Sequence, residues 1–345
     1  AHHMEPRKGT LYFISESDLL TGKGTGYFKI GLVNDSRSGG SAERAGEHQT
    51  GNPRKLAVHA EVNSPAIREL ETLMHALWAP SRVLGEWFAF STRELPRVVA
   101  SAEAYAGQQS EIESEIQRSK RNSDTFSNGK TRKPTSEELE WLSEYKQAYA
   151  ELKAIKEISE VEASLFQRVF DENDRIGELF AWRSRSSSER FDKKRFQEAH
   201  PDLFEQYSVL EKKSSGTFAM TKPKSGEIVI PRSLTKLLSE QSSAIDSVGR
   251  KPTESQLREI HLRHLAIRSL YGDSSWREDV AAMQIKAACG KYDGIDGVVK
   301  WARTEKESFN FSAITFKAEN PALYKKFCTT SVTTKFEIKN MRAYP

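Results

Sequence analysis

Alternation of apolar and polar positions near the start of the chain predicts three short strands. The strands are expected at residues 10–14, 27–33 and 55–61, with the sequences TLYFI, YFKIGLV and KLAVHAE. In the second strand Phe28, Ile30 and Leu32 form one apolar face. Its other face carries Lys29 and Gly31. Glycine weakens a strand interior and often marks a close approach, so we expect another group to come near this face.

Helical spacing separates and follows these strands. Residues 41–51 predict a helix that ends at Gly51, and apolar residues from Ile67 to Trp78 predict a second. Residues 85–90 read as a further strand or an extended turn. Residues 5–95 are therefore expected to form one domain, a small three-stranded antiparallel sheet flanked by helices.

The next segment is charged and then strongly basic. Residues 101–118 predict a helix, and residues 118–135 hold six basic residues and one acid among Ser, Asn and Gly. We expect residues 96–135 to be a helical and then flexible basic linker. Thr135 and Glu138 have the spacing of a capping box, which predicts a long helix ending near Phe170.

The second half of the chain contains an internal repeat. Aromatic and proline positions recur 120 residues apart, as in Phe191/Phe311, Phe196/Phe316 and Pro201/Pro321. The repeat predicts two small α+β modules, at 136–222 and 256–345, with a linker over 223–255. The fold class expected for the whole chain is therefore α+β.

The aromatic residues of the repeat, Trp182 among them, are expected in the core of each module. Basic residues between them could contact nucleic-acid phosphates, which gives affinity without sequence readout. These residues are Lys193, Lys194, Arg195, Lys317, Lys325 and Lys326.

Composition narrows the class of protein. No apolar run approaches the ~20 residues of a membrane helix, so we expect no membrane partner. Two cysteines give no disulfide framework and no cysteine-rich zinc site, which fits a reducing cytoplasm. The net charge of +4 is compatible with nucleic acid but does not require it.

The polar residues of the first domain form an ordered set. Tyr12 lies on the first strand and Lys29 on the second, Arg44 and His48 share a helix face, and Glu86 follows Gly85. The segments GTLYFI, YFKIG, ERAGEHQTGNP, LETLMH and GEWF carry this set. Their order and spacing resemble the GIY-YIG nuclease superfamily, in the branch of phage and bacterial proteins whose second motif reads KIG. The resemblance covers about a quarter of the chain.

The resemblance implies phosphodiester hydrolysis with one divalent metal, Mg²⁺ or Mn²⁺. Glu86 matches the metal-binding acid, Arg44 the arginine on the scissile phosphate, and Tyr12 the tyrosine beside the attacking water. Lys29 takes the place of the second-motif tyrosine, and His48 lies where several members have histidine. An arginine can bind phosphate through two parallel hydrogen bonds, and Mg²⁺ needs few carboxylates because it keeps several waters.

The general base stays open between Tyr12 and Lys29. Both are poor bases near their ordinary pKa of about 10, but a metal and an arginine should lower that pKa. Gly31 would let a phosphate approach the strand. Many members carry an Asn or Gln about a dozen residues beyond the metal glutamate, and RELPRVVASAEA has none at that place. Glu71 and His75, also four apart, are too few for a zinc site, so we expect a structural role for them.

The predicted function is a cytoplasmic metal-dependent endonuclease that cuts DNA, with double-stranded DNA as the expected partner. By analogy the setting is bacterial or phage restriction, defence or recombination. The repeats resemble modules appended to phage-type exonucleases, which leaves DNA or partner recognition open for them. Cutting both strands would need a homodimer or two encounters. The alternative is a catalytically inactive DNA-binding or scaffolding protein that keeps the nuclease fold.

Overall fold

The computed structural model describes residues 4–340. Helices and sheets both occur, so the expected α+β class is confirmed. The N-terminal sheet is antiparallel with the order β3-β1-β2-β5-β4, so it has five strands where we expected three. Of the two additional strands, β5 falls within residues 85–90, which we expected as a strand or an extended turn, and β4 is only three residues long, too short for alternation to reveal. The strands are β1 (Gly9–Ser17), β2 (Gly24–Asn34), β3 (Lys55–Ser64), β4 (Arg82–Leu84) and β5 (Trp87–Ala89).

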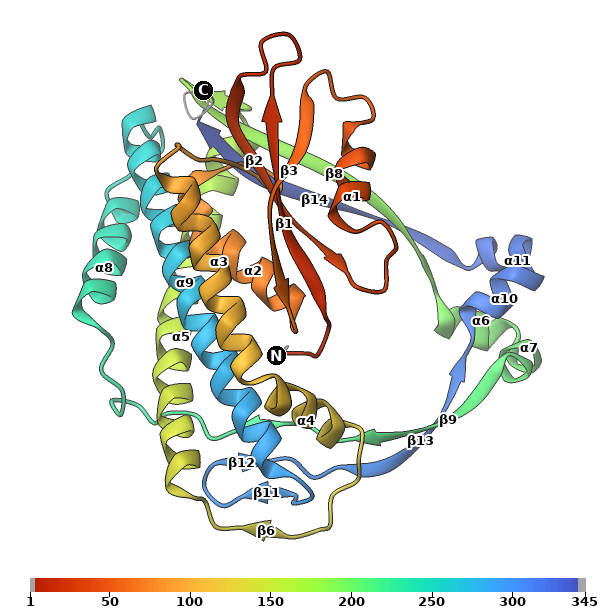
Figure 1. The fold of residues 1–345 in the computed structure, drawn as a ribbon. Helices are drawn as coiled ribbons and strands as arrows, with labels where there is room; N and C mark the ends of the chain where they lie inside the picture. The colour runs from red at the N-terminus through yellow and green to blue at the C-terminus, as the bar shows by residue number, and fades with distance from the viewer. Residues whose placement is uncertain (1–3, 341–345) are drawn as a thin grey trace.

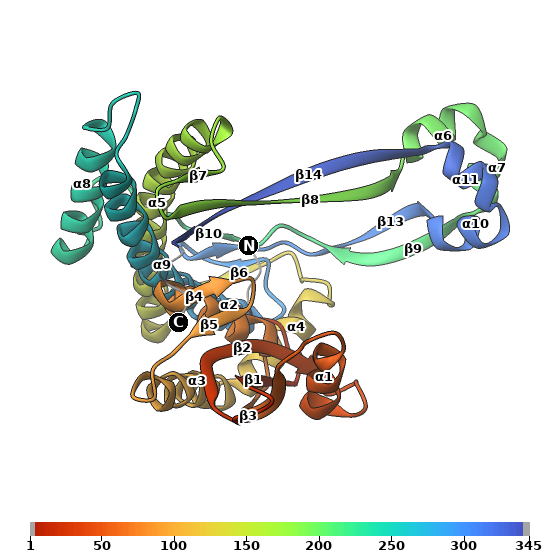
Figure 2. The same ribbon diagram turned by 90° about the horizontal axis from the view of Figure 1, so that it is seen from above.

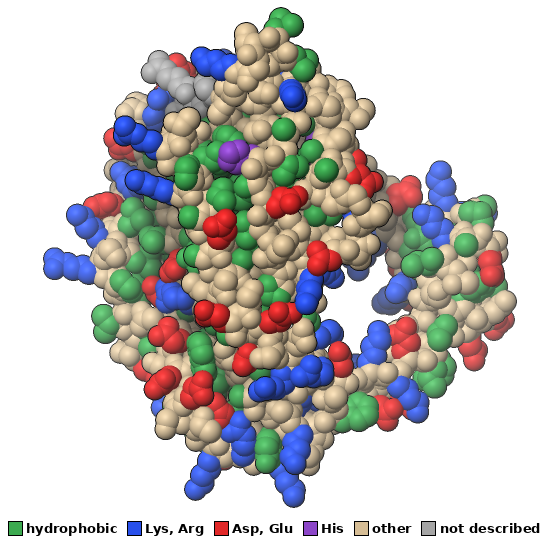
Figure 3. All heavy atoms as spheres, in the orientation of Figure 1, with side chains coloured by type: hydrophobic (Ala, Val, Ile, Leu, Met, Phe, Trp, Pro, Cys, Tyr) green, Lys and Arg blue, Asp and Glu red, His purple; other side chains and the backbone are tan. Residues whose placement is uncertain are grey.

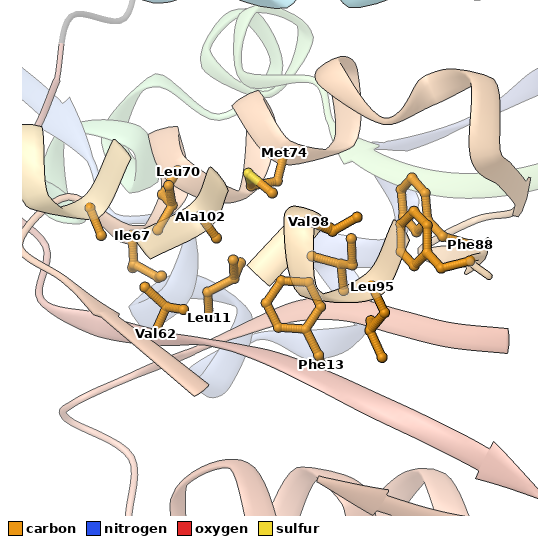
Figure 4. Close-up of a cluster of buried hydrophobic side chains, with 13 residues drawn as sticks. Leu11, Phe13, Val62, Ile67, Leu70, Met74, Phe88, Leu95, Val98 and Ala102 are labelled. Atoms are coloured by element: carbon orange, nitrogen blue, oxygen red, sulfur yellow. The ribbon is translucent and has the colours of Figure 1, made fainter. Parts of the chain in front are cut away.

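Helices cover both faces of this sheet (Figure 1). Helices α2 (Ile67–Leu77) and α3 (Glu94–Glu111) pack on one face, and α1 (Gly40–Gln49) packs on the other. A short 3₁₀ helix, Ala79–Ser81, follows α2. The larger core includes Leu11, Phe13, Leu70, Met74 and Val98 (Figure 4). The smaller core, under α1, contains Tyr12, Ile14, Val33, Ala45 and Leu56.

Two long helices, α5 (Ser136–Asp171) and α9 (Glu254–Cys289), lie side by side through the middle of the molecule (Figure 1). The expected capping box of Thr135 and Glu138 begins α5. The segment expected as a linker over 223–255 contains a further helix, α8 (Arg232–Asp246). Its Leu234 and Leu238 pack with residues of both long helices, so α8 belongs to the helical core.

The basic segment 118–135 is docked rather than loose. Part of it is α4 (Glu113–Ser123), and the Asn122 side chain donates to the carbonyls of Lys286 and Ala287 at 3.0 Å. The buried Arg303 donates to the Asn122 carbonyl. Further along, β6 (Thr131–Arg132) joins a sheet with β10 (Ala219–Met220), β11 (Gly294–Ile295) and β12 (Val299–Lys300). The expectation of flexibility is therefore wrong, because distant residues satisfy the backbone of this segment.

Two antiparallel ribbons extend from the helices to a small group of helices at their far end (Figure 2). One ribbon pairs β8 (Leu179–Phe191) with β14 (Cys328–Asn340), and the other pairs β9 (Ser208–Ser215) with β13 (Thr304–Phe311). A two-residue strand, β7 (Arg175–Ile176), pairs with the base of β8. We call the far helices the knob: α6 (Lys193–Ala199), α7 (Pro201–Gln206), α10 (Ala313–Glu319) and α11 (Pro321–Lys326). Figure 3 shows an opening between the knob and the rest of the molecule, with several Lys and Arg side chains at its edge.

The two copies of the repeat pair with each other. Each copy supplies one strand to each ribbon and one half of the knob. Phe191, Phe196, Phe311 and Phe316 meet in one buried cluster, which confirms them as core residues. Trp182, in contrast, is 46% exposed at the base of β8. The copies share one core instead of forming separate modules, because neither pair of short helices could bury its aromatic rings alone.

Candidate functional site

A pocket of about 420 Å³ lies beside β2, where the N-terminal sheet is narrowest. Strand β5 pairs with β2 only over Tyr27–Lys29. The turn before β5 contains Gly85, at a φ of 56°, and Glu86, whose carbonyl accepts from the Ile30 amide at 2.9 Å. Residues from β1, β2, α1, α2 and this turn line the pocket: Tyr12, Leu32, Arg44, Arg68, Glu71, Thr72 and Glu86. We call it the catalytic pocket, after the candidate catalytic residues Tyr12, Arg44 and Glu86 that line it.

Tyr12 reaches the pocket from β1 and is only 1% exposed. It lies opposite Gly31 in the register of β1 and β2, and a Cβ on Gly31 would lie 2.3 Å from the phenol oxygen. The glycine therefore makes room for Tyr12, which corrects our expectation that it makes room for a phosphate. Burial raises the pKa of Tyr12 and outweighs the opposing hydrogen bond from Arg44. We expected a bound metal and Arg44 together to lower this pKa; with Arg44 alone, burial dominates.

Glu86 and Lys29 form an ion pair. Lys29 is 8% exposed, whereas the Glu86 side chain is 43% exposed. Burial would raise the pKa of Glu86, but the hydrogen bond and the charge of Lys29 outweigh it and lower that pKa. An ammonium group has donors and no acceptor, so Lys29 in this pair serves as a counter-charge rather than as a base.

Arg44 and His48 lie one helical turn apart on α1, as their spacing predicts. The Arg44 Nη1 atom donates to Glu47 Oε2 at 2.6 Å. The Nε2 atom of His48 is buried and has no hydrogen-bond partner within residues 4–340. Burial and the charges of Lys29 and Arg44 lower the pKa of His48, so its imidazole is neutral at pH 7. His48 does not itself line the catalytic pocket.

Helix α2 adds Arg68, which sequence reasoning missed, and Glu71, for which we expected a structural role. Arg68 and Glu71 line the catalytic pocket from positions i and i+3 of one helix face. Burial, together with the charge of Glu86, raises the pKa of Glu71 to about 7. His75, in contrast, bonds through Nε2 to the Ile30 carbonyl at 2.9 Å, which agrees with a structural role. Glu71 lies within the quoted segment LETLMH, whereas the signal for Arg68 was its spacing of three residues from Glu71 on the same helix.

The carboxyl groups suit a cation that keeps its own waters. Glu71 and Glu86 line one pocket, and their mutual repulsion is what a divalent cation would relieve. Over residues 4–340 no group of three or more His, Cys, Asp or Glu could hold a metal ion. A zinc site of three or four protein ligands does not fit, whereas Mg²⁺ bound through one or two carboxylates does.

The six basic residues expected to contact nucleic acid lie in the knob, away from the catalytic pocket (Figures 1 and 2). Arg195 is engaged within the knob, since it donates to the Lys326 carbonyl at 2.6 Å and lies over the Phe327 ring. Lys317 lies over the Tyr324 ring. The structure thus groups these residues with one another and not with the site of the first domain.

Comparisons with protein-family models, curated proteins and solved structures each find no match to this chain. The resemblance to GIY-YIG nucleases therefore stays a prediction from the motifs. Across residues 4–340, no helix combines the length and the apolar character needed to cross a membrane.

Proposed function

We propose that this protein is a metal-dependent endonuclease that hydrolyses phosphodiester bonds in DNA. The observation that supports this most directly is the convergence of Tyr12, Arg44 and Glu86 on one pocket. These three residues come from different elements and were selected because their order and spacing resemble those of GIY-YIG nucleases. Each residue also has a purely structural explanation: Tyr12 as a core aromatic residue, Arg44 as part of a solvated helix face, and Glu86 as a surface carboxylate. None of these explanations requires the three residues to share a pocket.

Each side chain has a chemical role in this proposal. Arg44 and Arg68 bind the oxygens of the phosphate and stabilise the charge that develops on them. Tyr12 positions Arg44 through their hydrogen bond. Glu86, with Glu71 beside it, would hold Mg²⁺ or Mn²⁺, which when bound supplies charge stabilisation and a more acidic water.

His48 is the best-supported general base of the set. Lys29 is a donor held by Glu86, and burial raises the pKa of Tyr12. Its lowered pKa keeps His48 neutral at pH 7, its Nε2 has no hydrogen-bond partner among residues 4–340, and it follows Arg44 by one helical turn. A neutral imidazole can accept the proton of the attacking water, but for this role the His48 ring would have to turn from its buried position into the catalytic pocket, which it does not line.

The ribbons and the knob support a charged polymer as substrate. Residues 179–215 and 304–340 together hold fourteen Lys or Arg and ten Asp or Glu. Their excess of four positive charges equals the net charge of the whole chain, so the remainder is balanced. A positive extension beside an opening suits the phosphate backbone of double-stranded DNA, in keeping with a role in restriction, defence or recombination.

One observation favours the alternative of an inactive DNA-binding protein with a nuclease fold. Lys29 already neutralises Glu86, and a cation at Glu86 would have to compete with that ammonium.

A nicking assay on supercoiled plasmid distinguishes an endonuclease from an inactive DNA-binding protein. With Mg²⁺ or Mn²⁺ we expect the parent to nick the plasmid, EDTA to stop it, and Glu86→Ala and Arg44→Ala each to lose about 10²-fold or more in rate. Arg97→Ala and Glu103→Ala, both exposed on α3, are matched controls that should keep the parental rate. Plasmid binding without metal-dependent nicking would instead support the DNA-binding alternative.

A further inference from the structure

A second cavity, of about 880 Å³, lies between the N-terminal domain and the long helices. One face of α2, one face of α5 and one face of α9 line it, and the base of the β8–β14 ribbon closes it. It shares Glu71 and Thr72 with the catalytic pocket, so the two spaces are neighbours. We call it the interdomain cavity. Its volume is in the range of small-molecule sites, about 300–1,000 Å³.

The wall formed by α5 contains an unsatisfied acceptor. Glu162 is 1% exposed, and its Oε2 atom bonds to His264 Nδ1 on α9. The other oxygen, Oε1, is buried and has no partner within residues 4–340. Buried polar atoms are nearly always hydrogen-bonded, so Glu162 Oε1 is set to accept from a donor that enters the cavity. His261, one turn before His264, also lines this wall.

Other parts of the cavity lining offer cations and an aromatic ring. Arg268 lies on α9 one turn beyond His264, and Lys335 lies on β14; both are exposed, and neither forms an ion pair within residues 4–340. Trp182, an exposed aromatic residue of the repeat, lines the cavity from β8. An anion could reach Lys335 and Arg268 while a planar ring lies against Trp182.

We propose that the interdomain cavity binds one nucleotide, with a base amino group donating to Glu162 and the phosphate contacting Lys335 and Arg268. Glutamate is a known acceptor for the cytosine amino group. Uracil has the same ring but a carbonyl in place of that amino group, so it would face the Glu162 oxygen unfavourably. The nucleotide can be free, or it can be an unstacked residue of a strand that continues into the catalytic pocket. Binding does not depend on hydrolysis, so this proposal stands apart from the proposed nuclease function.

Calorimetric titration in EDTA tests the proposal and distinguishes the two sources. One arm uses CMP and UMP, and the other uses a deoxycytidine hexamer and a deoxyuridine hexamer. In at least one arm we expect the cytosine probe to bind about tenfold or more tightly than its uracil counterpart. Binding of CMP identifies a free nucleotide as a ligand, and binding of the hexamer alone identifies a strand.

Two variants assign the binding to this cavity. Glu162→Gln should abolish or reverse the cytosine preference, and Lys335→Ala should weaken both probes about equally. Glu160→Gln, exposed on the same helix, and Lys306→Ala, exposed on β13, make the same charge changes elsewhere and should bind as the parent does.

Absence of a cytosine preference in both arms, or the same preference in a folded Glu162→Gln variant, would overturn the proposal. If Glu162→Gln does not fold, the proposal is tested by the parent alone and by Lys335→Ala: it stands if the parent prefers cytosine and Lys335→Ala weakens binding, and it is overturned otherwise. A parent that binds cytosine probes but never nicks plasmid would support this site and oppose the nuclease.

Discussion

Tyr12 and Gly31 face each other across β1 and β2, and the phenol fills the space where a side chain on Gly31 would lie. This packing holds the tyrosine hydroxyl beside Arg44 at the floor of the catalytic pocket. The glycine of the KIG segment is thus explained by its neighbour in the sheet, which no reading of one strand alone could identify.

Gly31→Ala should displace Tyr12, because the new Cβ would lie within 2.5 Å of the phenol carbon that carries the hydroxyl. We expect it to lower the free energy of unfolding by about 1–3 kcal/mol in urea denaturation. Tyr12→Leu in the same chain should recover part of that loss, giving a favourable coupling between the two positions. Gly46→Ala, on α1 with open space around it, is the control and should not destabilise. A Gly31→Ala protein as stable as the parent would refute this packing.

His48 gives the site a defined pH dependence. Its pKa lies below the ordinary 6.5, so the imidazole gains a proton, and loses its lone pair, only below that pH. Cleavage should therefore be level between about pH 6.5 and 8 with respect to this group and fall at lower pH. His48→Gln should reduce the rate by about 10²–10⁴-fold and remove that fall, while His59→Gln on β3 should do neither. A fall that persists in His48→Gln would place the titrating base on another residue.

Secondary-structure elements could be predicted where a strong local pattern exists. The apolar spacing of α2 and the capping box of α5 are local, and both helices begin and end close to the expected residues. Helix α8 was missed because four of its residues are Ser and turn residues flank it. The docking of segment 118–135 was missed for another reason: its hydrogen bonds join residues far apart in the sequence, such as Asn122 and Lys286, which are 164 positions apart.

Some residues of the candidate site could be predicted from local sequence motifs, and others could be recognised only from the fold. Tyr12, Arg44 and Glu86 could be proposed together because motif order links them, and the structure places them around one pocket. Arg68 belongs to no quoted motif, and Glu71, within LETLMH, was expected to be structural. They enter the pocket only because α2 packs on the sheet with that face towards β2. Lys29 was expected as a catalytic group, and its ion pair with Glu86 could be recognised only from the fold.

At the scale of the whole molecule, the knob depends on both copies of the repeat. The rings of Phe196 and Phe316 lie 4.7 Å apart between centroids, one from each copy. Neither copy therefore has a complete core without the other.

Phe196→Ala and Phe316→Ala should each destabilise the knob by about 3–5 kcal/mol, because each opens the same buried cluster. Hydrogen exchange should show lost protection in α6, α7, α10 and α11 in both variants, with the N-terminal core unchanged. Ile314→Ala, at an 86% exposed position of α10, should leave protection as it is. Loss confined to the mutated copy would mean that the two halves are independent.

The pairing of β8 with β14 also has a consequence for biosynthesis. Ser188 meets Ser331, which is 143 positions later in the chain. At about 5–20 residues per second, β8 leaves the ribosome roughly 7–30 s before its partner is translated. During that interval its backbone edges are unpaired, and an apolar strand would invite association between nascent chains. The middle of β8 reads SRSSSER, a charged and hydroxyl-rich sequence, which keeps the strand hydrated until β14 is made.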